Sequence, residues 1–129
     1  MISWPALVSI LRHRSYVVAS VHTALGDTEM IRFRDDLVHQ AAAPWCEGVI
    51  IDVAGLDVLD SFGFTTIRSI AEVARLRGAL TVIVGIQPDV ALAMARLRVG
   101  TGSVATAADL DDGVSSLDRA HPRASPPPR

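Results

Sequence analysis

Residues 49–63 read VIIDVAGLDVLDSFG, and their order predicts a buried strand, a turn and the start of a helix. The apolar run that ends at Val53 is too short for a good helix and is typical of a strand covered on both faces. The turn carries Asp57 and Asp60, and Ser61 stands where the helix begins. Unpaired N–H groups and partial positive charge at that position suit a serine hydroxyl and suit a phosphate better. We therefore predict a phosphorylation switch at Ser61.

Working outward from this stretch, strands and helices alternate along most of the chain. The elements are recognised by short apolar or β-branched runs for strands and by apolar residues three or four apart for helices. They are strands at Ala6–Leu11, Tyr16–Val21, Gly48–Val53, Ala79–Ile86 and, weakly, Ser103–Ala105, with helices from Asp27 to a stop at Pro44, from Ser61 to Gly78, from Pro88 to Gly100 and over Asp109–Leu117.

This alternation predicts an α/β fold with a mostly parallel sheet of four to five strands, an antiparallel N-terminal strand pair and about four helices. A chain of 129 residues, half of them apolar, closes one core and has no room for a second. We expect one domain over residues 1–120. Residues 121–129 are rich in proline and have little to bury, so we expect a disordered or extended tail there.

Composition excludes several classes of function. A net charge of −2 offers no basic surface for a nucleic-acid backbone. Cys46 is the only cysteine and the four histidines lack metal-ligand spacing, so we expect no disulfide, metal or cofactor. No apolar run approaches the roughly 20 residues of a membrane helix, and the first residues lack a signal sequence. These features favour a cytoplasmic protein.

Three motifs give the chain a family resemblance. GVIID at 48–52, DVLDSF at 57–62 and VGIQPDVA at 84–91 resemble the STAS domain family, in its RsbS-like stressosome branch, over roughly residues 6–118. The resemblance implies a STAS fold and a non-enzymatic scaffold or antagonist in bacterial stress signalling. It implies that the protein sequesters a switch serine kinase of the RsbT type until Ser61 is phosphorylated, that a phosphatase restores the serine, and that RsbR-like STAS paralogues assemble with it.

The residues around Ser61 predict the surface that a partner reads. Asp57, Asp60, Phe62 and Gly63 form the expected partner-binding set, because an exposed aromatic beside a modifiable serine suggests a docking surface. A phosphate adds about −1.5 to −2 charges beside the two carboxylates. We expect the domain to stay folded when modified while its outer surface changes. Gly63 is a poor helix former and is expected to cost the first turn up to about 1 kcal/mol relative to alanine.

Other readings stay open at this point. The alternatives are a free anti-sigma-factor antagonist that binds an anti-sigma kinase, a small serine hydrolase and a ligand-sensing module. The hydrolase is the least supported of these alternatives, because Leu59 occupies the position at which a nucleophile elbow needs glycine. We expect Thr65 and Thr66, one turn further on, to be structural residues and not a second phosphorylation site. Asp52 is expected to support the turn by accepting backbone hydrogen bonds.

Overall fold

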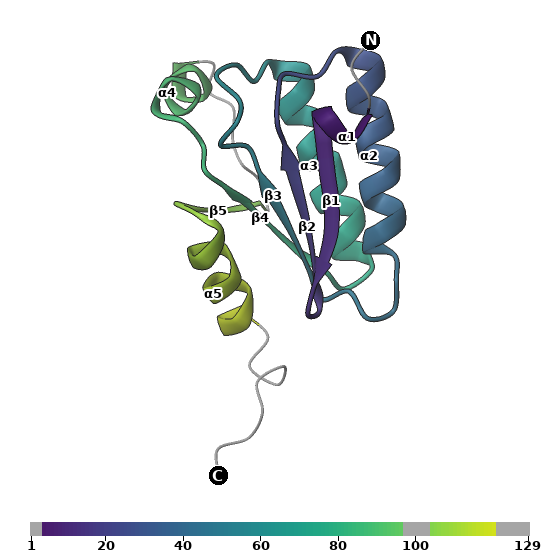
Figure 1. Ribbon diagram of the computed structural model, residues 1–129. Coiled ribbons are helices and arrows are strands. Elements are labelled where there is room, and N and C mark those ends of the chain that lie inside the picture. The colour runs from purple at the N-terminus through teal and green to yellow at the C-terminus, as the bar shows by residue number, and fades with distance from the viewer. Residues whose placement is uncertain (1–3, 97–103, 121–129) are drawn as a thin grey trace.

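The computed structural model describes residues 4–96 and 104–120 (Figure 1). The predicted tail at 121–129 and the predicted helix end at Gly100 lie outside the described residues. Among the described residues, no helix combines the length and the apolar character that crossing a membrane requires. The elements follow one another as α1 (Trp4–Leu7), β1 (Val8–His13), β2 (Tyr16–Val21), α2 (Asp27–Ala41), β3 (Gly48–Asp52), α3 (Ser61–Leu76), β4 (Leu80–Val84), α4 (Pro88–Arg96), β5 (Ala105–Ala107) and α5 (Leu110–Ala120).

The strands form one five-stranded sheet in the order β1-β2-β3-β4-β5. β1 and β2 are antiparallel, with Val8 opposite Val21, and every later pair is parallel. The α/β class, the antiparallel start and the largely parallel sheet predicted from the sequence are confirmed. Because the parallel strands end at the same edge of the sheet, the connections that follow β3 and β4 lie side by side.

The ends of the chain differ from the predicted element bounds. Trp4–Leu7 forms a short helix, α1, that the sequence did not predict. The first strand therefore begins at Val8 and not at Ala6. Proline is well tolerated in a first helical turn, which Pro5 occupies, and the turn brings Leu7 into the core. The last strand runs over Ala105–Ala107; of the predicted Ser103–Ala105, Ser103 lies outside the described residues and Val104 is not part of the strand.

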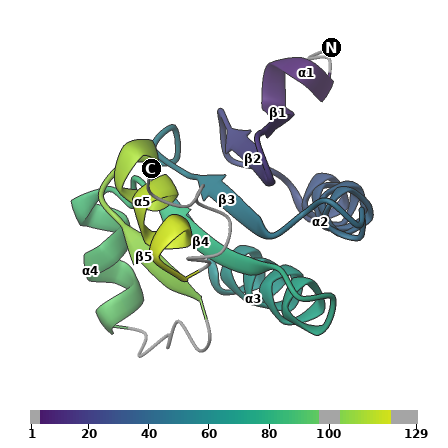
Figure 2. The same cartoon turned by 90° about the horizontal axis from the view of Figure 1, so that it is seen from below.

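Helices cover the two faces of the sheet unequally (Figure 2). α2 and α3 pack together on one face and bury the apolar stripes that the sequence indicated; α2 contributes Met30, Phe33, Leu37 and Ala41. α5 lies on the other face, where Leu117 packs with Tyr16, Val18 and Ile50. A Cβ on Gly113 would lie 2.7 Å from Val84, so glycine lets α5 approach the sheet closely.

A polar clamp ties α5 to the hairpin between β1 and β2. Arg14, in the turn with a φ of 57°, donates to both carboxylate oxygens of Asp118 at 2.8 and 3.1 Å, and the Tyr16 hydroxyl donates to the same carboxylate. Burial and the bond to Asp118 raise the pKa of Tyr16 to about 12. The hydrogen bond from Tyr16 lowers the pKa of Asp118. The clamp therefore stabilises the fold above the ordinary carboxyl pKa of 3.8 and below the ordinary tyrosine pKa of 10.0, and is lost toward either extreme.

We predict that Asp118→Asn lowers the free energy of unfolding by about 1 kcal/mol at neutral pH, because a partly exposed charge-assisted contact is lost. The difference from the wild type should shrink as the pH falls below the ordinary carboxyl pKa of 3.8, because the unfolded carboxylate is protonated first and the native one, whose pKa is lowered, follows. Urea unfolding at several pH values measures this. Asp35→Asn, which removes a surface pair with Arg34, is the matched control and should change little. A loss of equal size at every pH would contradict the clamp.

Candidate functional site

The connection between β3 and α3 starts with a turn that its own residues stabilise. The Asp52 carboxylate accepts a hydrogen bond of 2.9 Å from the Ala54 N–H, which confirms the structural role predicted for it. The Leu56 N–H then donates to the Val53 carbonyl at 2.9 Å and closes the turn. The chain is thereby turned back over the carboxyl end of the sheet before it reaches Ser61.

Close backbone approaches hold this turn on both sides. A Cβ on Gly55 would lie 2.9 Å from the His22 carbonyl oxygen, so only glycine fits against the end of β2. On the other side Gly85, with a φ of 77°, brings the β4–α4 connection against Ala54. Gln87 Nε2 donates to the Ala54 carbonyl at 2.7 Å. The residues that lead to Ser61 are thus fixed by two neighbouring connections.

Asp60 caps helix α3, and Ser61 is the first helical residue. The Asp60 carboxylate accepts a hydrogen bond of 2.7 Å from the Gly63 N–H, and its backbone is extended, with φ −83° and ψ 176°. The cap is therefore the aspartate, and no hydrogen bond within the described chain engages the Ser61 hydroxyl. Ser61 is exposed, so its oxygen is accessible to another protein.

An apolar and acidic surface surrounds the serine. Phe62 is 42% exposed and Val58 is 62% exposed, so two large apolar side chains close in sequence to Ser61 reach the solvent. Asp57 and Asp60 are exposed beside them. We call Asp57, Val58, Asp60, Ser61 and Phe62 the serine patch. The sequence indicated four of its members; Val58 was missed, although its position between Asp57 and Leu59 in a polar turn was a usable signal.

Gly63 lies beneath the serine patch. It is buried, and a Cβ there would lie 2.9 Å from Leu59, 3.2 Å from Asp60 Oδ1 and 3.3 Å from Met30. Glycine at this position therefore lets the turn, the cap and α2 come together. Gly63 is buried and has no side chain, so it can affect partner binding only through the position of the loop.

The two threonines of the first turns of α3 differ in environment. Thr66 is buried, and its hydroxyl donates to the Phe62 carbonyl at 2.8 Å. Thr65 is exposed, and its carbonyl accepts from Ser69 Oγ at 3.1 Å. Thr66 thus serves the helix, while Thr65 provides an accessible hydroxyl one turn away from Ser61.

The other chemical groups of the chain lie apart from Ser61. Cys46 is buried, and burial raises the pKa of its thiol, which disfavours the nucleophilic thiolate. His22 is engaged with Ser9 Oγ at 2.8 Å. Within residues 4–96 and 104–120, no histidine, cysteine, aspartate and glutamate side chains cluster as a metal site would require.

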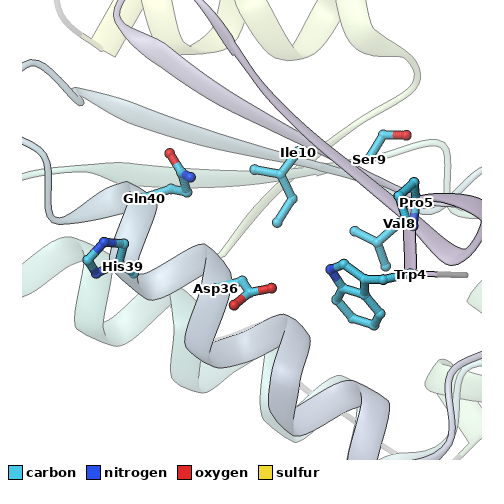
Figure 3. A pocket seen from close by; sticks show the side chains of 8 residues that line it. All are labelled: Trp4, Pro5, Val8, Ser9, Ile10, Asp36, His39 and Gln40. Carbon is cyan, nitrogen blue, oxygen red and sulfur yellow. The ribbon is translucent and has the colours of Figure 1, made fainter.

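Three hollows in the surface are lined by residues away from the serine patch. The hollow drawn in Figure 3 has a volume of about 490 Å³ and lies between α1, β1 and α2, with Trp4, Ile10 and Asp36 facing it. A second, of about 520 Å³, lies between α5 and the outer strands and includes Leu11. A third, of about 390 Å³, separates α4 from β5. None of these three hollows is lined by a residue of the serine patch.

Comparison with known proteins yields a consistent set of matches. A family model described as the STAS domain matches residues 12–111. A structure of a serine-to-glutamate variant of RsbS from Moorella thermoacetica is 29% identical, with a TM-score of 0.78 over 89% of this chain and 97% of that one. A structure titled as the molecular architecture of the stressosome, a signal integration and transduction hub, is 28% identical, with a TM-score of 0.70 over 88% of this chain and 98% of that one.

A more distant match concerns the fold alone. The Bacillus cell fate determinant SpoIIAA in its phosphorylated form is 15% identical, with a TM-score of 0.62 over 88% of this chain and 98% of that one. A search of curated protein sequences found no significant match.

We predict that Gly63→Ala lowers the free energy of unfolding by about 1–3 kcal/mol, because the added methyl group meets Leu59 and the capping carboxylate. Thermal or urea unfolding measures the loss. Thr65→Ala, an exposed change in the same helix, is the control and should stay within about 0.5 kcal/mol of the wild type. A Gly63→Ala protein as stable as the wild type would show that the loop can move to make room for the methyl group without a loss of folding free energy.

Proposed function

This chain belongs to the STAS domain family, and from that premise we propose that it is an RsbS-like antagonist in a bacterial partner-switching system. In this proposal the unmodified serine patch binds and sequesters a switch serine kinase of the RsbT type in the cytoplasm. Phosphorylation of Ser61 releases the kinase, and a phosphatase restores the binding form. RsbR-like STAS paralogues assemble with the protein as a scaffold.

The observation that carries the proposal is the geometry of Ser61. Ser61 is exposed at the first position of α3, and Asp60 provides the cap of the helix. A phosphate there lies beside a positive helix end that favours it and beside two carboxylates that repel it. The net effect on folding is small, whereas about two negative charges are added to the surface that Phe62 and Val58 make apolar.

The likeness to known structures supports the RsbS-like branch over the free antagonist. The two matches with stressosome-related titles share 28–29% of their residues with this chain, against 15% for phosphorylated SpoIIAA. The surroundings of Ser61 support the part of the proposal that the protein is not an enzyme. No hydrogen bond joins it to a histidine within the described residues, and His22, at the same end of the sheet, is bound to Ser9. A serine nucleophile needs a base within hydrogen-bond reach.

We predict that an RsbT-type kinase with ATP adds one phosphate to the wild type and none to Ser61→Ala, as read by mass spectrometry of the intact protein and its peptides. Thr65→Ala is the matched control, since it removes the neighbouring exposed hydroxyl, and should be phosphorylated like the wild type. Phosphate elsewhere in the chain with Ser61 untouched would overturn the assignment.

We further predict that Phe62→Ala weakens capture of the kinase by tenfold or more, because a half-exposed aromatic at the centre of a docking surface is a typical anchor. Leu76→Ala, at the far end of α3 and 87% exposed, is the control and should leave capture unchanged. Ser61→Asp should abolish capture while melting within about 4 °C of the wild type. Equal capture of the kinase by Ser61→Asp and the wild type would contradict the proposed phosphorylation switch.

A further inference from the structure

Helix α4 is only sparsely attached to the rest of the described fold. Its buried side chains are those of Val90 and Met94. It makes few close approaches to any other described helix or strand, whereas α2 packs against α3 and α5 packs against the sheet. In Figures 1 and 2 α4 lies on the β5 side of the molecule, apart from α2 and α3. The connection from β4 is therefore an important determinant of where α4 lies.

The hollow of about 390 Å³ between α4 and β5 has an almost entirely apolar lining. Met94 and two alanines line it from α4, Ile86 lines it from the β4–α4 connection, and Thr106 and two further alanines line it from β5 and the residue that follows. None of these described residues carries a charge. The volume lies within the range of roughly 300–1,000 Å³ that is typical of small-molecule sites, toward its lower end.

The lining specifies the chemistry of an occupant. A charged molecule would lose its hydration without gaining a charged partner among these residues, whereas an apolar molecule gains by leaving water. The Thr106 hydroxyl is the one side-chain hydrogen-bonding group in the lining, so it suits a single polar group on the occupant. Met94 has a flexible side chain that adapts to the shape of what it contacts.

The walls of this hollow contact the residues that fix the loop before the serine patch. The Gly85 N–H donates to the carbonyl of Ala107, which lines the hollow, at 3.3 Å. Gly85 in turn closely approaches Ala54. Ile86, another lining residue, immediately precedes Gln87, whose Nε2 donates to the Ala54 carbonyl at 2.7 Å. The hollow and the serine patch are thus joined by one short connection, residues 85–87.

We propose that the α4–β5 hollow is a regulatory site for a small, uncharged, mostly apolar molecule, and that its occupancy is transmitted to the serine patch through residues 85–87. A molecule that contacts both Ile86 and Ala107 binds best when these residues are in place. It therefore stabilises the arrangement in which their neighbours hold Ala54, and opening of the loop becomes rarer.

Titration with 2-naphthol, an uncharged bicyclic molecule with one hydroxyl group, tests the site on the full chain. With the methionine methyl groups labelled for NMR, the Met94 signal should move as 2-naphthol binds. Ala95→Phe fills the hollow from α4 and should raise the dissociation constant about tenfold or more. Ala93→Phe is the matched control, because it makes the same change at an exposed position of the same helix outside the lining, and it should bind like the wild type.

Both variants are expected to fold, since Ala93 and Ala95 are exposed, and melting curves check this. A Met94 signal that does not move up to the solubility limit of 2-naphthol would overturn the proposed site. Equal dissociation constants for Ala93→Phe and Ala95→Phe would overturn it as well.

Amide hydrogen exchange of residues 53–60 tests the coupling without a kinase. Saturating 2-naphthol should slow this exchange about fivefold or more. Gln87→Ala removes the hydrogen bond to Ala54, so it should still bind 2-naphthol but lose the slowing. Gln40→Ala, the same change in α2, is the matched control and should keep it. Slowing that persists in Gln87→Ala, or is absent from the wild type, would contradict the coupling. This inference does not rest on the proposed function, because neither measurement involves phosphorylation of Ser61.

Discussion

The contact of Ala54 with the β4–α4 connection is the constraint on which the site depends. Gly85 and Gln87 hold Ala54 from one side, and the end of β2 meets Gly55 from the other. A loop of this length would otherwise sample many conformations, and ordering it costs free energy for each residue. Packing between connections offsets that cost, so Ser61 is presented from a fixed position at the edge of a rigid sheet.

The charges at the start of α3 explain how the proposed phosphorylation of Ser61 would change binding while the fold persists. Asp60 already satisfies the Gly63 N–H, so the helix does not need the serine for its cap. The proposed phosphate on Ser61 would therefore act outward, on whatever approaches Phe62 and Val58. The neighbouring carboxylates would sharpen the contrast between the two proposed forms, because a phosphate beside them would make a strongly anionic surface where the unmodified one is apolar and mildly acidic.

The two ends of the sheet have separate physical roles. The carboxyl ends of the parallel strands carry the serine patch, whereas the opposite end carries the Arg14–Tyr16–Asp118 clamp that ties α5 to the hairpin.

Local patterns in the sequence determined the α/β class, the antiparallel start, the apolar stripes of α2 and α3, and the position of Ser61 at a helix start. They were sufficient because apolar periodicity and turn residues act over a few positions. Two features needed the tertiary structure: Gly63 as a close-packed contact with Met30 of α2, and the clamp between Tyr16 and Asp118. Each joins groups whose separation or orientation is set by packing of distant segments, which no local pattern encodes.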